Sequence, residues 1–394
     1  MRDAYIVAYA RSAVGKAVKG SLKETRPDDI AAQVIKGLLN RVPQVDPKEI
    51  DDFILGCATT EGPQGLNLAK VVLDRADLPF EMTGQTINRF CSSGLQSLAA
   101  AAHSIMVGEA DIMIAGGVES MSFVPSGGKH VSPNPWLVAN RGGCYLPMGV
   151  TAENVARKYN VSREEQDQWA YESNMKAAKA IAEGKFKDEI IPIEAVRTVV
   201  DEMGNERKET FIFDKDEGVR ANTTVESLAT LKPAFAKEDG SVTAGNSSQM
   251  NDAAAMIMLM SGEKADELGL KKLAKYKAFA VAGVEAELMG IGPMKAVPKA
   301  LKKAGLTMEQ IDLIELNEAF ASQVIPCVKE LGMDKNKVNV NGGAIALGHP
   351  MGATGAWLTM KVINELRRRN GKYGMVTMCI GGGMGAAGIF EIVD

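Results

Sequence analysis

Cysteine and histidine side chains beside tight, glycine-rich turns are the first candidates for chemistry in this sequence. Cys91 lies in residues 86–98, where an apolar run ends in a Cys-Ser-Ser-Gly corner and an Ala-rich segment continues to Val107. This pattern predicts a strand, a sharp turn and a buried helix that starts at Cys91. The free N–H groups and the dipole of a helix start favour a thiolate, the nucleophilic form of cysteine. A small buried cysteine used only for packing is the alternative.

His349 is the histidine best placed for chemistry, among only three in the chain. It lies in residues 341–355, whose glycines allow the backbone to approach a ligand closely and whose Pro350 stiffens the turn. His103 falls in the Ala-rich helix and His130 in a Gly/Pro loop, where packing or surface roles are expected. A histidine beside a cysteine is the pair that an activated thiolate needs.

Two polar residues follow predicted strands near the carboxyl end. Cys379 precedes Ile-Gly-Gly-Gly-Met-Gly, whose bare backbone N–H groups suit an oxyanion. Asn317, in Asn-Glu-Ala-Phe, is a neutral hydrogen-bond donor at another strand end. The alternative role for Asn317 is a cap of the following helix.

The order of predicted elements repeats along the chain. A helix followed by a strand at 50–57 returns as a helix followed by a strand at 311–318, and the Cys91 corner returns as the His349 corner. The landmarks recur at an offset of about 260 residues, which predicts two copies of one α/β half with helices on both sheet faces. A pseudo-twofold axis would then bring Cys91 and His349 together. Chance likeness between two α/β stretches is the alternative.

Between the halves the chain changes character. Residues 122–147 are rich in Gly, Pro and Asn, and a capping box at Ser162 starts a helix that runs to about Glu183. We therefore expect an inserted loop domain at 122–246, one half at 1–121 plus 247–270 and the other at 271–394. The insertion carries a set of basic residues: Arg197, Arg207, Lys208, Lys215, Arg220, Lys232 and Lys237. A solvated surface explains most of these charges, and a lid that recognises an anionic ligand is the second interpretation.

Composition narrows the class of protein. The 394 residues are 46% apolar with 40 Gly and 5% aromatic residues, which indicates an aliphatic α/β protein with a large core. The net charge of −4 argues against nucleic acid as a partner. Five cysteines without a C-x-x-C pair disfavour both a disulfide framework and a metal site. No leader and no long apolar run is apparent, so we expect a cytoplasmic protein without a membrane span.

Together these motifs resemble the thiolase family. The matching stretches span nearly the whole chain in the family's order, at 88–96, 116–122, 148–154, 245–252, 317–320, 348–355 and 379–385. The resemblance implies a duplicated five-layer α/β/α/β/α fold with an inserted loop domain. It also implies cleavage or formation of 3-ketoacyl-CoA, with coenzyme A as substrate, no permanently bound cofactor, and a homodimer or homotetramer.

The resemblance also implies roles for individual residues. Cys91 corresponds to the nucleophile, Cys379 to the acid/base, and His349 with Asn317 to an oxyanion hole. A second hole uses the backbone N–H groups of Cys91 and Gly381. Residues that correspond to coenzyme A contacts are Met148, Arg220, Ser227, Phe235, Ser248, Ala319 and Phe320.

The residue before Met148 bears on which subtype of thiolase the sequence resembles. Biosynthetic acetoacetyl-CoA thiolases carry a His there, whereas this chain has Pro147 and a Cys-Ser-Ser-Gly corner, both similar to the degradative branch. We therefore expect a broad-range thiolase of fatty acid β-oxidation, with a short-chain acetyl-CoA acetyltransferase as the alternative. A ketoacyl synthase would be expected to have two basic or amide side chains opposite the nucleophile, whereas here one of the two partners is Cys379. A non-catalytic carrier would lack a reactive residue, and redox sensing by Cys91 and Cys379 would be a side activity.

Acylation of Cys91 is the first testable consequence. Incubation with acetyl-CoA or acetoacetyl-CoA, followed by denaturation and peptide mass mapping, should place an acyl group on the Cys91 peptide, because the nucleophile becomes a thioester. Cys91→Ala should abolish turnover and keep the fold. Acylation confined to Cys57, Cys144 or Cys327 would contradict the assignment.

Overall fold

A mixed sheet of ten strands organises the chain in a computed structural model that describes residues 2–393. Along the sheet the strands follow the order β10-β11-β12-β9-β1-β8-β5-β3-β4, with β2 beside β8. Their bounds are β1 (Ala4–Arg11), β2 (Gly15–Lys16), β3 (Asp52–Gly56), β4 (Gly84–Ile87), β5 (Ile112–Ser120), β8 (Asn251–Ser261), β9 (Ala274–Gly283), β10 (Leu313–Leu316), β11 (Tyr373–Ile380) and β12 (Met384–Ile392).

The sheet is built from two copies of one pattern, which confirms the predicted repeat. The order β3-β5-β8-β1 in one half matches β10-β11-β12-β9 in the other, and each copy has one parallel pair followed by two antiparallel pairs. A parallel bridge between Ile314 and Val338 occupies the place that β4 takes beside β3. The halves join where β1 meets β9, through Tyr5–Lys275 and Ile6–Ala274.

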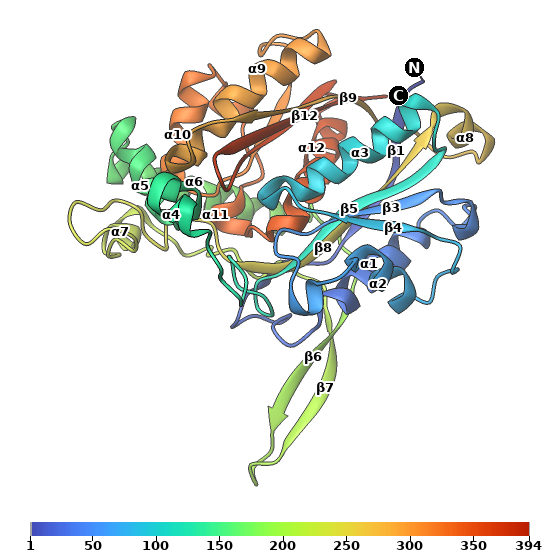
Figure 1. The fold of residues 1–394 in the computed structure, drawn as a ribbon, viewed down its shortest axis with the longest axis horizontal. Helices are drawn as coiled ribbons and strands as arrows, with labels where there is room; N and C mark the ends of the chain where they lie inside the picture. The colour runs from blue at the N-terminus through green and yellow to red at the C-terminus, as the bar shows by residue number, and fades with distance from the viewer. Residues whose placement is uncertain (1, 394) are drawn as a thin grey trace.

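Helices complete five layers (Figure 1). Helices α1 (Pro27–Leu39) and α2 (Leu68–Arg75) cover the outer face of the first half, and α9 (Gly292–Ala304) with α10 (Ala321–Glu330) covers that of the second. Helices α3 (Ser93–Val107) and α12 (Met351–Arg369) lie between the two half-sheets. Helix α12 is buried over most of its length, whereas α3 has one side with exposed residues, His103 and Val107; both contribute to the central core.

Glycines set the distance between the two central helices. A Cβ atom at Gly94 on α3 would lie 2.7 Å from the carbonyl oxygen of Gly352 and 2.9 Å from the backbone nitrogen of Ala356 on α12. A Cβ atom at Gly355 would lie 2.7 Å from Cβ of Leu95. The two helix starts therefore touch backbone to backbone, which only residues without a side chain allow. This contact brings the Cys91 and His349 corners together.

The connection from β5 to β8 holds the inserted segment. It contains α4 (Pro135–Arg141), α5 (Met148–Lys158), α6 (Arg163–Ala182), the hairpin β6 (Ile193–Val200) and β7 (Glu206–Phe213), and α7 (Val225–Ala229). The predicted capping box is present, because Ser162 and Glu165 bond each other's backbone N–H groups at 3.1 and 2.8 Å. The hairpin projects away from the layers (Figure 1). Two of its basic residues, Arg197 and Arg207, pair with Glu209, so they belong to a solvated surface.

None of the described helices is long and apolar enough to cross a membrane.

A single methyl group should test the contact between the central helices. We expect Gly94→Ala to lower the free energy of unfolding by about 3 kcal/mol, because the new Cβ meets backbone atoms that cannot rotate away. Gly142→Ala is the control, since a Cβ there meets nothing within 4 Å; its effect should stay within about 0.5 kcal/mol. Equal stability of the two variants in urea unfolding would contradict the tight contact.

Candidate active site

The Cys91 corner is a strained turn held by side chains. Phe90 has φ of +43°, a region that bulky residues rarely adopt, and a 3-10 turn at Phe90–Ser92 leads into α3. Asn88 Oδ1 accepts from the N–H of Phe90 at 2.8 Å, and the Ser93 hydroxyl donates to Phe90 O at 2.7 Å while accepting from the N–H of Arg89 at 2.9 Å. These hydrogen bonds hold the backbone of the turn and so fix the direction of the Cα–Cβ bond of Cys91.

The His349 ring is oriented by Thr354. The hydroxyl of Thr354 donates its only proton to Pro350 O at 2.9 Å, so it accepts from Nδ1–H of His349 at 2.7 Å. This leaves Nε2 without a proton, 3.4 Å from Nδ2 of Asn317. Burial lowers the pKa of His349 to about 4, so the ring is neutral near pH 7. His349 can therefore accept a proton at Nε2 and donate it afterwards.

Parallel pairing places Asn317 and Cys379 at the carboxyl ends of two neighbouring strands. Strands β10 and β11 run parallel, and the N–H of Asn317 continues their ladder by donating to Thr377 O at 2.9 Å. Cys379 is the next-to-last residue of β11, and its side chain is fully buried. Strand β11 contacts the Phe90–Ser92 turn, and a negative charge on the Cys91 sulfur would raise the pKa of Cys379.

Gly381 connects the end of β11 to the Cys91 corner. Its backbone N–H lies near enough to the Cys91 sulfur to lower the pKa of that thiol. A Cβ atom at Gly381 would lie 3.6 Å from the sulfur of Met148 and 3.9 Å from the ring of Phe90. The structure thus gathers Cys91, Cys379 and Gly381 in one place, and it pairs His349 with Asn317.

Both thiols are protonated at rest. Burial raises the pKa of Cys91 to about 11, although the N–H groups of Gly381 and Cys91 itself act in the opposite direction. Burial also raises the pKa of Cys379 well above its ordinary value. The expectation of a resting thiolate at Cys91 is therefore wrong, because desolvation outweighs the N–H groups and the helix start. The proton must leave as the sulfur attacks.

Five of the seven residues expected to contact coenzyme A form one wall. The N–H of Ser248 donates to Ala319 O at 2.9 Å, and Phe320 meets Phe235 edge to face with ring centroids 6.2 Å apart. The Phe235 ring covers the backbone of Gly149. The wall comprises Met148, Phe235, Ser248, Ala319 and Phe320, and it borders Cys379.

Arg220 and Ser227 are not brought to that wall. Both are exposed, and the Ser227 hydroxyl is used in a capping box with Thr224. Arg220 is held through its backbone N–H, which donates to Asn174 Oδ1 at 3.1 Å. Within residues 2–393 no hydrogen bond joins either side chain to the wall, and both are exposed on the inserted segment.

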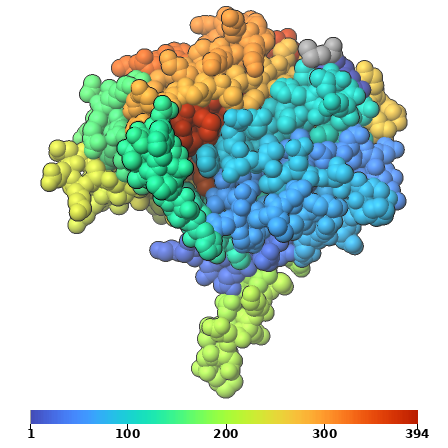
Figure 2. Space-filling model, in the orientation of Figure 1, coloured from blue at the N-terminus to red at the C-terminus, as the bar shows by residue number. Residues whose placement is uncertain are grey.

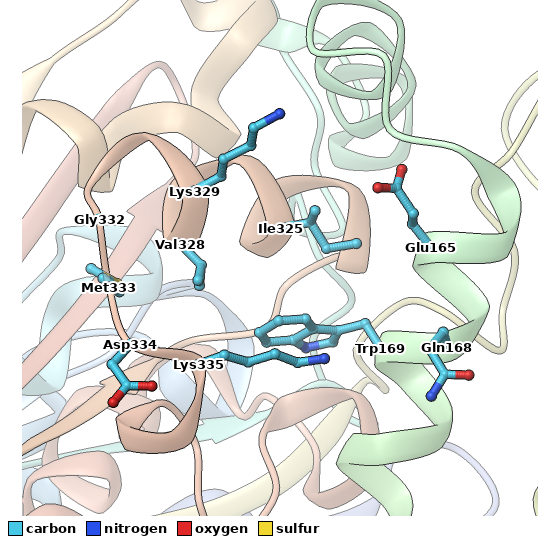
Figure 3. A pocket seen from close by; sticks show the side chains of 10 residues that line it. All are labelled: Glu165, Gln168, Trp169, Ile325, Val328, Lys329, Gly332, Met333, Asp334 and Lys335. Carbon is cyan, nitrogen blue, oxygen red and sulfur yellow. The ribbon is translucent and has the colours of Figure 1, made fainter.

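The surface is hollowed where these parts meet. Figure 2 shows the red carboxyl-terminal segment at the bottom of a hollow between the green inserted segment and the blue amino-terminal half. A separate cavity of about 540 Å³ lies between α6 and α10, walled by Trp169, Ile325 and Lys335 (Figure 3). That cavity contains none of the proposed catalytic residues.

A buried carboxylate that was not singled out from the sequence joins the two halves. Glu119 accepts from the N–H groups of Ala58 and Gly352 at 2.8 and 2.9 Å and from Gln64 Nε2 at 2.9 Å. Gly352 is the third residue after His349, so Glu119 anchors the His349 corner to the half that carries Cys91. The sequence feature that could have identified Glu119 is an acidic residue inside an otherwise apolar predicted strand, in Gly-Gly-Val-Glu-Ser.

The pH dependence of Cys91 alkylation tests its protonation state. Because the pKa of Cys91 is raised to about 11, the thiolate fraction should rise about tenfold per pH unit from pH 7 to 9. The rate of iodoacetamide labelling of the Cys91 peptide, followed by mass spectrometry, should rise in parallel. Cys91→Ser identifies the peptide, and a plateau below pH 9 would contradict the raised pKa.

Comparisons with known proteins agree with this geometry. The model of the thiolase N-terminal domain matches residues 4–263, and that of the thiolase C-terminal domain matches residues 270–392. A 3-ketoacyl-CoA thiolase of Bacillus subtilis is 56% identical over 392 residues, covering 100% of both chains. The peroxisomal 3-ketoacyl-CoA thiolase 1 of Arabidopsis thaliana is 46% identical, covering 99% of this chain and 87% of that one. The crystal structure of the Bacillus anthracis acetyl-CoA acetyltransferase has a TM-score of 0.89 and 42% identity, covering 100% of this chain and 99% of that one. Two family models thus account for nearly the whole chain, and it belongs to the thiolase family.

Proposed function

We propose that this thiolase cleaves 3-ketoacyl-CoA with coenzyme A, giving acetyl-CoA and an acyl-CoA shortened by two carbons. The observation that carries the proposal is that two buried thiols, Cys91 and Cys379, lie on contacting elements, the Phe90–Ser92 turn and β11, with the Gly381 N–H near the Cys91 sulfur. One thiol serves as nucleophile and the other as acid/base. The His349–Asn317 pair supplies donors beside them.

The first half-reaction breaks the carbon–carbon bond. The Cys91 sulfur attacks the C3 ketone while its proton moves to Nε2 of His349, the unprotonated ring nitrogen. The C2–C3 bond then breaks, its electron pair goes to C2 as the enolate of acetyl-CoA, and the Cys379 thiol protonates C2. Acetyl-CoA leaves, Cys91 carries the acyl group as a thioester, and Cys379 is a thiolate.

The second half-reaction restores the enzyme. The Cys379 thiolate takes the proton of the incoming coenzyme A thiol, whose sulfur attacks the acyl group on Cys91. The carbon–sulfur bond to Cys91 breaks, and the proton held on His349 returns to the Cys91 sulfur. One thioester replaces another, so little free energy changes and the step is reversible.

Two oxyanions form and require separate donors. The oxygen of the attacked ketone lies next to the Cys91 sulfur, so the backbone N–H groups of Cys91 and Gly381 serve it. The enolate oxygen belongs to the departing acetyl-CoA, and we assign it to Asn317 Nδ2 and to Nε2–H of His349 after proton transfer. Donors fixed before the reaction in a buried site stabilise such charges strongly.

Pro147 supports the degradative subtype. It caps α5 immediately before Met148 and can supply neither an imidazole nor a backbone N–H to the covering loop. The apolar cluster of Met148, Met289 and Phe320 around Cys379 suits an alkyl chain. The relatives named 3-ketoacyl-CoA thiolase favour the same subtype, whereas the structural neighbour named acetyl-CoA acetyltransferase keeps the short-chain alternative in view.

Further assignments complete the proposal. Arg220 and Ser227, both exposed on the inserted segment, would contact the part of coenzyme A far from its thiol, with the Arg220 guanidinium on a phosphate.

All five cysteines are free, which suits the cytoplasm. The edge strand β4, together with the exposed Leu66 and Phe80 in the loops on either side of α2, suits a homodimer or homotetramer. We keep the domain bounds 1–121 plus 247–270, 122–246 and 271–394.

Chain-length dependence decides the subtype. We expect kcat/KM to rise from acetoacetyl-CoA to 3-ketohexanoyl-CoA and 3-ketooctanoyl-CoA, because each buried methylene contributes up to about 0.8 kcal/mol. Thiolysis is followed through the loss of ketoacyl-CoA absorbance at saturating coenzyme A, with Cys91→Ala as the blank. Activity confined to acetoacetyl-CoA would make the short-chain acetyltransferase the correct function.

A further inference from the structure

The residue after Asn317 is a buried carboxylate surrounded by donors. Glu318 is 1% exposed. It accepts from Trp169 Nε1 at 3.0 Å, Asn339 Nδ2 at 2.9 Å, the Ser173 hydroxyl at 2.6 Å and the N–H of Ile345 at 3.3 Å. No Lys or Arg within residues 2–393 forms an ion pair with it. Its charge is therefore satisfied entirely by neutral donors.

Those donors belong to three segments that surround the proposed oxyanion pair. Trp169 and Ser173 lie on α6 of the inserted segment. Ile345 lies in α11 (Ala344–Leu347), immediately before Gly348 and His349, and the Ser173 hydroxyl also accepts from the N–H of Gly343 at 3.0 Å. Glu318 thus connects α6 to the segment that delivers His349.

Asn339 closes the network on the side of Asn317. Its side chain brackets Leu316, with Oδ1 accepting from the Leu316 N–H at 2.9 Å and Nδ2 donating to Leu316 O at 2.8 Å. The same Nδ2 bonds Glu318. The backbone on both sides of Asn317 is therefore anchored, one residue before it and one residue after it.

The Asn317 side chain makes few hydrogen bonds that could fix its orientation. Its Oδ1 is buried without a partner, and its Nδ2 meets His349 at 3.4 Å, beyond the usual range of a strong hydrogen bond. The direction of the amide is consequently set by the backbone that carries it. That backbone is held by Thr377 O, which accepts from the Asn317 N–H, and on either side by Asn339 and Glu318.

We propose that Glu318 is a positioning residue, which holds Asn317 and the His349 segment in register with α6 so that both donors face the enolate oxygen. This inference rests on the oxyanion role proposed above for Asn317 and His349. A neutral amide at position 318 cannot satisfy four donors, because one side of the amide is itself a donor, and a buried donor without a partner disturbs its segment.

Trp169 offers a milder way to loosen the network. Its ring forms a wall of the cavity between α6 and α10 and faces Lys335, whose Nζ is 5.4 Å from the ring centroid (Figure 3). Trp169→Phe keeps an aromatic ring there and removes the N–H that bonds Glu318. Glu172→Gln is the matched control on α6, since Glu172 pairs with Lys335 and has no bond to Glu318.

Comparison of two reactions provides the test. Thiolysis of acetoacetyl-CoA passes through an enolate, whereas exchange of the acetyl group between acetyl-CoA and labelled coenzyme A does not. We expect Glu318→Gln and Trp169→Phe to lower kcat of thiolysis on the order of 10-fold or more, with KM changed by less than about 2-fold. Exchange should fall at least about 3-fold less than thiolysis, and Glu172→Gln should leave both rates unchanged.

The outcomes separate this inference from the proposed site. Equal losses of thiolysis and exchange, or unchanged thiolysis in both variants, would overturn the positioning role of Glu318. If Glu318→Gln does not fold, Trp169→Phe decides alone, with its melting temperature measured beside the rates. Asn317→Ala is the reference: unchanged thiolysis in that variant would instead overturn the oxyanion assignment itself.

Discussion

The backbone contact between α3 and α12 is the constraint on which the rest of the structure depends. Each helix begins at a corner that carries a candidate catalytic residue, so the separation of the helices sets the separation of Cys91 and His349. Gly94 and Gly352 occupy equivalent places, each three residues after its candidate catalytic residue. Duplication of one half therefore supplied both the corner and the small residue that lets two corners meet. Glu119 strengthens the same junction, because its carboxylate binds the start of α12 from the opposite half.

Burial shapes the chemistry as strongly as the choice of residues does. Both thiols and the imidazole are neutral at rest, so the closed site holds no net charge on these groups. Charge appears only during the reaction, when a proton moves and an oxygen becomes negative. Because Cys91, His349 and Cys379 are buried, nearby N–H donors would then act with less competition from solvent than at an exposed site. The raised pKa also keeps the proposed nucleophile, Cys91, mostly in its less reactive thiol form near pH 7.

Much of the fold and part of the site could be predicted from the sequence. The repeat was visible because strands and glycine corners recur in order, and Cys91, His349 and Cys379 stand in short motifs. Three features were not accessible. The pKa of Cys91 depends on burial by the other half, which its own corner does not reveal. Glu318 stands beside a predicted donor, yet its partners come from α6 and α11, far away in the chain. Arg220 and Ser227 were assigned by likeness and stay predictions, because their positions depend on the path of the inserted segment.

The position of β8 has a consequence for how the molecule is made. This fully buried strand lies between β1 and β5, yet it follows both of them and the whole inserted segment in the chain. A ribosome therefore releases β1, β3, β4 and β5 long before their central neighbour exists, and the edges of β1 and β5 stay unpaired for more than a hundred residues of synthesis. Pairing over such sequence distances is slow, and unpaired apolar edges associate with other chains. Folding of the amino-terminal half must wait for residue 261, so the nascent chain is the stage at which this protein is most exposed to aggregation.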